Sequence, residues 1–135
     1  MSFLLADFEP YRGMTGIYAF WQGDDCTYVG KALCIYQRVK SHRTRFARYG
    51  YFTVYDCTSY IASLDYKNAE RFLRLMEAYF IMQYDPFENI DRPNFFSLLR
   101  KSAKTRIAHD KVAEVTDCYK RIDIPWVLSK AMGNT

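Results

Sequence analysis

The side chains of this sequence that are best suited to chemistry are two tyrosines, two cations and a glutamate. Arg38 carries a planar guanidinium that matches two phosphate oxygens, and Lys31 adds a point charge. Glu77 is a hard carboxylate suited to one Mg²⁺ or Mn²⁺ ion that keeps several waters. Positive charge beside Tyr18 or Tyr28 would stabilise a phenolate, so we expect a lowered pKa at one of these phenols.

The two tyrosines lie in two short segments of β type. Residues 15–21 are apolar and aromatic and contain Gly16-Ile17-Tyr18. Residues 26–29 contain Tyr28 and are followed by Gly30. The Gly and Asp residues between them, within 22–25, are typical of a turn. Two such segments around a polar turn predict a β-hairpin, which would place Tyr18 opposite Tyr28.

The next segment, from residue 32 to about residue 47, changes to a helical period. One stripe of the expected helix is apolar and consists of Ala32, Ile35, Val39 and Phe46. Arg38, His42 and Arg45 form an adjoining stripe at spacings i, i+4 and i+7. We expect the apolar side to pack while its shoulder presents two guanidiniums and an imidazole.

The remaining pattern predicts one α+β domain over residues 1–135. Residues 49–61 predict a third strand, and residues 67–84 predict an amphipathic helix that ends at Asp85-Pro86. Weaker helical patterns cover residues 94–104 and 105–121, and a turn or short helix is expected over 125–132. We therefore expect a small three-stranded antiparallel sheet flanked by helices, with a core over residues 14–95 and a helical C-terminal extension over 96–135.

Basic residues are clustered along the chain. The net charge is +4, from 19 Lys and Arg and 15 Asp and Glu, and alone it favours a nucleic-acid partner only weakly. One cluster consists of Arg38, Lys40, Arg43, Arg45 and Arg48 with His42, and a second consists of Arg100, Lys101, Lys104 and Arg106. Two such clusters can contact a phosphate backbone. The alternative is that both are ordinary solvated helix faces.

Several function classes lack their usual motifs. The sequence contains no G-x-x-x-x-G-K-[ST], G-x-G-x-x-G, H-E-x-x-H or G-x-S-x-G. Its four cysteines form no C-x-x-C pair, so we expect no structural zinc site. The apolar runs are far shorter than the ~20 residues that cross a bilayer, and the N-terminus lacks a basic n-region. We expect an intracellular, cytoplasmic protein with no membrane partner.

Gly16-Ile17-Tyr18 and Tyr28-Val29-Gly30, about ten residues apart and followed by Arg38, resemble the motifs of the GIY-YIG nuclease family. The stretch YVGKALCIYQRVKSH is especially similar to the N-terminal incision domain of the UvrC excision nucleases, and EAYFIMQYDPFEN, from Glu77 to Asn89, resembles the acidic helix and loop of the family. The resemblance covers roughly residues 14–95. Val29 departs conservatively from the middle residue of the second tripeptide.

The resemblance implies a role for each matched residue. Tyr18 would be the general base, Tyr28 would orient water or phosphate, Arg38 would stabilise the transition state, and Glu77 would be the sole metal ligand. The alternatives are that the tyrosines are core aromatics, that Arg38 lies on a solvated shoulder, and that Glu77 is a surface partner of Arg74 or Lys67.

Three further residues complete the expected site. His42 falls where members of the family carry Tyr or His, and it would replace Tyr18 as base or bind phosphate. Glu70 lies on the same helix margin as Glu77 and is its rival as metal ligand. Asn89 resembles the asparagine that ties the loop to the active site, with an ordinary loop cap as the alternative.

The function implied is that of a free-standing DNA endonuclease that uses one Mg²⁺ or Mn²⁺ ion per site. Free-standing members of the family include restriction and phage-borne nucleases, which implies a phage or mobile-element origin and action in the host cytoplasm. DNA contacts are expected at Gly30, Lys31, Arg38, Lys40, Arg43, Arg45, Arg48, Asn89, Arg100, Lys101 and Lys104. One site per chain implies a homodimer or two successive nicks for a double-strand break. The alternatives are a catalytically silent nucleic-acid-binding module of the same fold and an RNA endonuclease.

Overall fold

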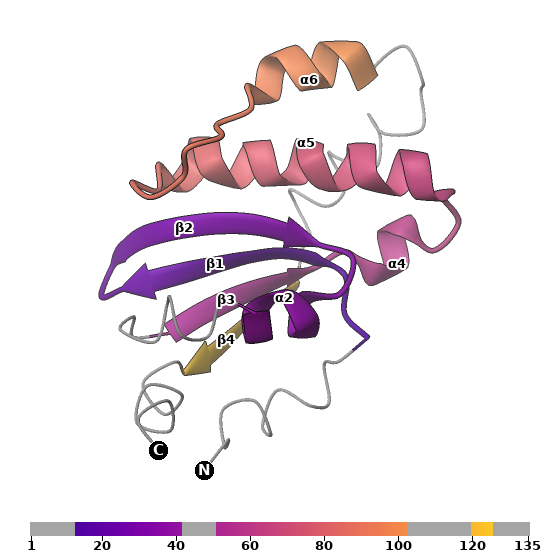
Figure 1. The fold of residues 1–135 in the computed structure, drawn as a ribbon. Coiled ribbons are helices and arrows are strands. Elements are labelled where there is room, and N and C mark those ends of the chain that lie inside the picture. Colours follow the sequence, from indigo (N-terminus) through magenta and orange to yellow (C-terminus); the bar gives the residue numbers. More distant parts are fainter. Residues whose placement is uncertain (1–12, 42–50, 103–119, 126–135) are drawn as a thin grey trace.

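The computed structural model describes residues 13–41, 51–102 and 120–125. The strands are β1 (Gly16–Gln22), β2 (Asp25–Ala32), β3 (Tyr51–Asp56) and β4 (Lys120–Pro125). The helices are α2 (Ile35–Ser41), α4 (Thr58–Ile61), α5 (Tyr66–Tyr84) and α6 (Phe95–Ser102). Figure 1 shows α5 along one face of the sheet with α6 beyond it, and α2 on the other face. The expected α+β architecture is confirmed.

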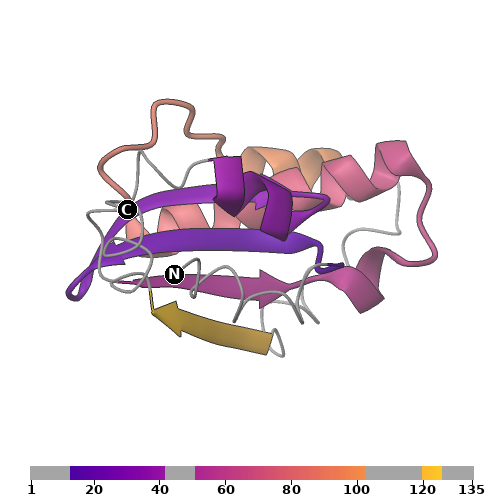
Figure 2. The ribbon, with the colours of Figure 1, turned by 60° about the horizontal axis from the view of Figure 1, so that its bottom comes forward.

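The strands form one antiparallel sheet in the order β2-β1-β3-β4. Side chains of β1 are buried on both faces: Ile17, Ala19 and Trp21 pack with the α5 layer, whereas Tyr18 and Phe20 pack with the α2 layer. The two-residue period of a strand produces this alternation, and burial on both faces explains why the segment is apolar almost throughout. Figure 2 shows α2 on the β2 side of the sheet, away from β4.

The third strand is shorter than the sequence pattern over residues 49–61 predicts. β3 ends at Asp56, and the short helix α4 follows at once. The Asp56 carboxylate accepts hydrogen bonds from the Thr58 N–H at 2.9 Å and from the Thr58 hydroxyl at 2.6 Å. An Asp that binds the backbone two residues further on forms a turn, so this local bond ends the strand despite the β-prone composition.

The C-terminal extension is not entirely helical. α6 confirms the helix expected within residues 94–104, but Lys120 and Arg121, expected at the end of a helix over 105–121, belong to β4. β4 pairs with β3 from Lys120 opposite Asp56 to Pro125 opposite Tyr51. The alternation of charged and apolar residues in KRIDIP is a strand period, and the partner strand outweighs the weak helical pattern. Residues 105–119 and 126–132 lie outside the described part of the chain.

Both ends of α5, which carries Glu77, are set by nearby residues. Asp65 caps the first turn by accepting a hydrogen bond from the Asn68 N–H at 2.8 Å. Asp85 ends the helix in a left-handed conformation, with its N–H bound to the Ile81 carbonyl. In the described ranges no helix has both the length and the apolar character needed to span a bilayer.

Candidate active site

The centre of the candidate site is the phenol of Tyr18, which crosses from β1 to the neighbouring strand β2. Tyr18 lies opposite Gly30 in the register of the two strands. A Cβ at Gly30 would lie 2.5 Å from the Tyr18 hydroxyl oxygen and 2.5 Å from its Cζ atom, so the ring covers the glycine backbone. Gly30 therefore provides the space through which the phenol reaches the edge of the sheet.

Tyr28 lies on β2 beside Tyr18 and is half-buried. The two ring centroids are 6.2 Å apart, and Phe20 packs against both rings. The register pairs Tyr28 with Phe20, so the two tyrosines are diagonal neighbours. The expectation that Tyr18 lies directly opposite Tyr28 is wrong. Diagonal neighbours on one face are within reach of aromatic side chains, and the hairpin still brings the two phenols together.

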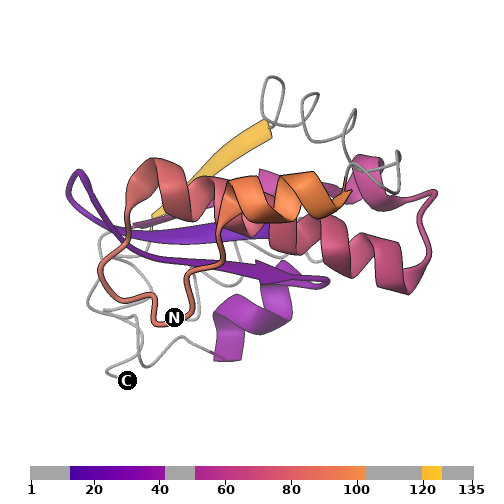
Figure 3. The same cartoon turned by 90° about the horizontal axis from the view of Figure 1, so that it is seen from above.

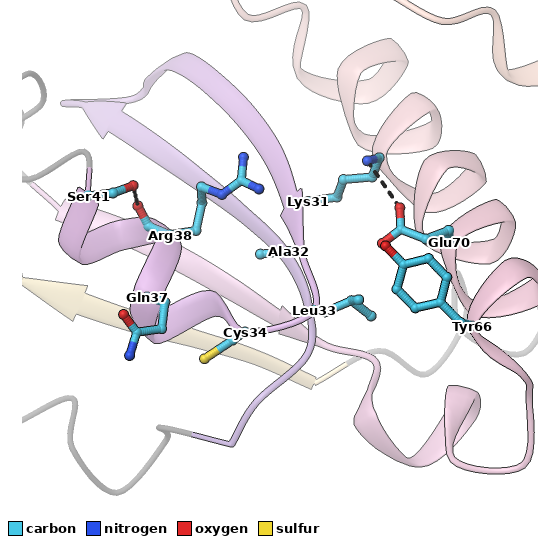
Figure 4. Close-up of a pocket in the computed structure, with 9 residues that line it drawn as sticks. All are labelled: Lys31, Ala32, Leu33, Cys34, Gln37, Arg38, Ser41, Tyr66 and Glu70. Atoms are coloured by element: carbon cyan, nitrogen blue, oxygen red, sulfur yellow. Dashed lines mark hydrogen bonds and ion pairs between the residues drawn. The ribbon is translucent and has the colours of Figure 1, made fainter.

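Arg38 comes from α2, which begins soon after β2. The Ile35 N–H donates to the Met14 carbonyl at 3.0 Å, and Ile35 and Val39 are buried, so the helix is held on the sheet. Arg38 itself is exposed, and Figure 4 shows its guanidinium directed toward β2. Its positive charge opposes the rise in the pKa of Tyr18 that burial causes.

Glu77 reaches the site from α5 and is half-buried. Burial raises the pKa of its carboxyl group and outweighs the opposite effects of Lys31, Arg74 and Arg38, which all lower it. Arg74 forms an ion pair with Asp91 at 3.6 Å, so its charge is shared between Asp91 and Glu77. Glu77 is therefore a partly desolvated carboxylate surrounded mainly by cations, which is unlike an ordinary surface glutamate.

The pKa of Tyr18 is raised, so the lowered value expected at Tyr18 or Tyr28 does not occur at Tyr18. Burial is the largest cause, Tyr28 and Glu77 also raise the pKa, and Arg38 lowers it. The side chain is 0 % exposed, so the loss of hydration disfavours the phenolate more than one guanidinium favours it. Tyr28, Arg38 and Glu77 therefore all act electrostatically on Tyr18.

Glu77 is better placed than Glu70 to hold a divalent cation at this site. Glu70 forms an ion pair with Lys31 at 3.5 Å, whereas Glu77 acts on Tyr18. Within residues 13–41, 51–102 and 120–125, no three Asp, Glu, His or Cys side chains gather into a cluster that could hold a metal ion. A cation at Glu77 would take its other ligands from water and phosphate oxygens, as Mg²⁺ commonly does. The residues fit a one-metal site completed by the substrate.

Asn89 fastens the loop after α5 to the backbone of β2. The Val29 N–H donates to Asn89 Oδ1 at 2.9 Å, and Asn89 Nδ2 donates to the Val29 carbonyl at 2.8 Å. The Glu88 N–H adds a bond to the Thr27 carbonyl at 2.9 Å. Because Val29 engages both ends of the amide, Asn89 holds the loop on β2. The nucleic-acid contact expected of Asn89 from the sequence stays a prediction.

The two basic clusters are described only in part. Arg38 and Lys40 are exposed on α2, and Arg100 and Lys101 are exposed in the last turn of α6. Figure 3 shows α6 lying over α5, while Figure 1 places α2 on the opposite face of the sheet. The described members of the two clusters therefore lie on different sides of the sheet. Outside the described residues lie His42, Arg43, Arg45, Arg48, Lys104 and Arg106.

The structure adds residues that the sequence patterns did not select. Gln37, Ser41 and Tyr66 line a pocket together with Lys31 and Arg38. Tyr66 continues the apolar stripe of α5 by spacing, yet its ring is 71 % exposed. No sequence spacing relates residues of α2 to the first turn of α5, so only the folded chain reveals this grouping.

Comparison of the chain with protein-family models, with curated proteins and with solved structures gives no match in any of the three. The resemblance to the GIY-YIG nucleases therefore rests on the residues of this chain alone. What the structure adds is their arrangement around Tyr18.

Proposed function

We propose that this protein is an endonuclease of the GIY-YIG type that hydrolyses DNA phosphodiester bonds with one divalent cation. The observation that carries the proposal is the position of the Tyr18 phenol, on which Tyr28, Arg38 and Glu77 all act. These groups come from β1, β2, α2 and α5 and match the needs of phosphodiester hydrolysis: a base, a cation for phosphate and a metal-binding carboxylate. A half-buried Glu77 with a raised pKa is also typical of functional sites.

Arg38 is assigned to the scissile phosphate. Its guanidinium can donate to two nonbridging oxygens and neutralise the charge that builds up on them during attack. Glu77 would hold Mg²⁺ or Mn²⁺, which when bound supplies Lewis-acid polarisation of the phosphate. Lys31 lies beside Glu70 at 3.5 Å and adds positive charge near Glu77, whose pKa it lowers.

Tyr18 is assigned to take a proton from the attacking water as the oxygen bonds to phosphorus and the 3′-oxygen leaves. The phenol must first lose its own proton, and its raised pKa makes this demanding at neutral pH. Arg38 lowers that pKa, so one guanidinium can serve both the phosphate and the base. The half-buried Tyr28 orients water or phosphate next to Tyr18.

Nicking of supercoiled plasmid in Mg²⁺ or Mn²⁺ tests the proposal. We expect nicking by wild type and a nicking rate at least about 100-fold lower in Glu77→Gln. Mutation of a residue that only hydrogen-bonds to a metal ligand already lowers activity ~10–100-fold, and loss of the ligand itself should cost more. Asp24→Asn removes an exposed carboxylate in the hairpin turn and should retain activity as a matched control. No nicking by folded wild type, or full activity of purified Glu77→Gln, would overturn the proposal.

One observation favours a second function, that of a nucleic-acid-binding module without catalysis. The Tyr18 hydroxyl is buried and its pKa is raised, which hinders a base. Such a module would bind DNA with a steep salt dependence and cut nothing in either metal. Labelled DNA and RNA of equal sequence, compared in the same assay, also distinguish a DNA endonuclease from an RNA endonuclease.

A further inference from the structure

A pocket of about 460 Å³ opens between α2, the end of β2 and the first turns of α5 (Figure 4). All three elements contribute polar side chains to its lining: Lys31, Gln37, Arg38, Ser41, Tyr66 and Glu70. Its volume lies within the range of pockets that bind small organic ligands. The roles assigned above use Lys31 and Arg38 but leave the pocket itself without an occupant.

Arg38 joins this pocket to the candidate active site. Arg38 lines the pocket, and its charge also acts on Tyr18 and Glu77. Figure 4 shows Arg38 on the α2 side and Lys31 on the β2 side, each presenting a cation. If Arg38 binds a phosphate of the substrate, the nucleotide attached to that phosphate would therefore lie at the pocket.

The α5 wall of the pocket consists of an aromatic ring beside a carboxylate. Tyr66 is 71 % exposed, so its ring is accessible to a flat ligand. Glu70 lies beside it in Figure 4 and pairs with Lys31 at 3.5 Å. This ion pair is long and partly exposed, and such pairs contribute little, so the carboxylate can also accept a hydrogen bond from a ligand amino group.

We propose that the pocket binds an unpaired nucleotide of the substrate, next to the phosphate held by Arg38. Stacking on Tyr66 suits every base, and Glu70 can accept a hydrogen bond from the amino group of adenine, cytosine or guanine. This inference rests on the proposed function. It narrows the substrate of the proposed endonuclease to DNA that has an unpaired nucleotide at the cleavage site, such as a bulge or a flap. A base inside a duplex is stacked and paired, and it would first have to leave the helix.

Binding without cleavage tests this inference directly. Fluorescence anisotropy in EDTA compares a fully paired duplex with the same duplex carrying a single-nucleotide bulge. We expect wild type to bind the bulged duplex about 5- to 100-fold more tightly, the range that stacking of one base on one aromatic ring provides. Equal affinity for the two duplexes would overturn the inference.

Variants of Tyr66 identify the group responsible. Tyr66→Ala should abolish the preference for the bulged duplex, whereas Tyr66→Phe keeps the ring and should retain it. Because the Tyr66 ring is exposed, its removal should leave the thermal unfolding midpoint almost unchanged. Phe96→Ala removes another exposed ring, on α6, and should leave the preference intact. A preference that survives in Tyr66→Ala would contradict the inference.

A nucleoside phosphate can reach the pocket as part of a strand or as a free mononucleotide, and titration with deoxynucleoside monophosphates separates the two. Tyr66-dependent binding of the mononucleotides together with equal affinity for both duplexes would make the pocket an effector site and refute the substrate assignment. The proposed function fails separately: a Tyr66-dependent preference for the bulge with no nicking in Mg²⁺ or Mn²⁺ would retain the pocket and reject the nuclease.

Discussion

The phenol of Tyr18 lies directly over the backbone of Gly30 on the neighbouring strand. The space that a Cβ would occupy at Gly30 is taken by the hydroxyl oxygen and the Cζ atom, each 2.5 Å away. The Tyr18 ring therefore packs against the backbone of Gly30, and no side chain lies between them. The second glycine of the two-tripeptide motif is therefore needed for the position of the first tyrosine.

Gly30→Ala should destabilise the protein by about 1–3 kcal/mol, the usual cost of inserting an extra carbon into a packed interior. It should also reduce nicking, because the ring must move away from β2. Urea unfolding and the plasmid assay measure the two effects. Gly13→Ala is the matched control, because nothing lies within 4 Å of a Cβ at that position. Unchanged stability and activity in Gly30→Ala would show that the Tyr18 ring does not need the space above the glycine.

Glu77→Gln should make the protein more stable at neutral pH while abolishing its activity. Burial raises the pKa of Glu77, so the folded state binds the proton more tightly than the unfolded state does. The charged carboxylate therefore reduces the free energy of unfolding above the folded pKa, and this penalty disappears as the pH falls below the unfolded value of about 4.3. Glutamine has no such penalty at any pH.

Thermal unfolding at several pH values measures this difference. The midpoint of Glu77→Gln should exceed that of wild type at pH 7, and the gap should shrink as the solution is acidified. A wild-type protein that gains stability over the variant as the pH rises would mean that the cations around Glu77 outweigh its burial, and the assigned cause of the raised pKa would be wrong.

The local parts of the site were predictable from the sequence because they depend on short segments. The turn between Tyr18 and Tyr28 fixes their strands as a hairpin, and Arg38 follows on the next helix. The position of Glu77 on an amphipathic helix was predictable, but Glu70 lies on the same margin, and only the family resemblance selected Glu77. These relationships depend on hydrophobic period and turn chemistry, which neighbouring residues determine.

The properties that failed prediction depend on contacts between distant segments. The pKa of Tyr18 is raised because the side chain is fully buried in a cluster that includes Phe52 and Val54 of β3, and no local pattern shows this. β4 is a strand because β3 offers it a free edge. The pocket combines Tyr66 of α5 with Gln37 of α2, which the chain brings together only when folded.

Tyr18→Phe should remove the alkaline rise in nuclease activity. If Tyr18 acts as a phenolate, the wild-type rate should still increase with pH above neutrality, because the pKa of the phenol is raised by burial. Loss of a general base typically costs 10²–10⁴-fold, so the variant should be weak as well as insensitive to pH in this range. Single-turnover rates between pH 6 and about pH 10 measure both quantities.

Tyr28→Phe serves as the comparison for this prediction. It removes the neighbouring hydroxyl but leaves the proposed base, so a reduced rate with the alkaline rise preserved is the expected result. The same rise in Tyr18→Phe would assign the base role to a group other than Tyr18.

Asn89→Ala should loosen the loop after α5 and lower the free energy of unfolding by about 1–3 kcal/mol, because two hydrogen bonds to Val29 are lost. Hydrogen exchange should accelerate at the Val29 amide, which donates to Asn89 Oδ1. Ile90→Ala changes the next residue, which is 97 % exposed, and should alter neither quantity. If Asn89 instead contacts DNA, Asn89→Ala would weaken DNA binding while leaving stability and exchange at Val29 unchanged. The structure favours the first outcome, because the Asn89 amide both accepts from the Val29 N–H and donates to the Val29 carbonyl.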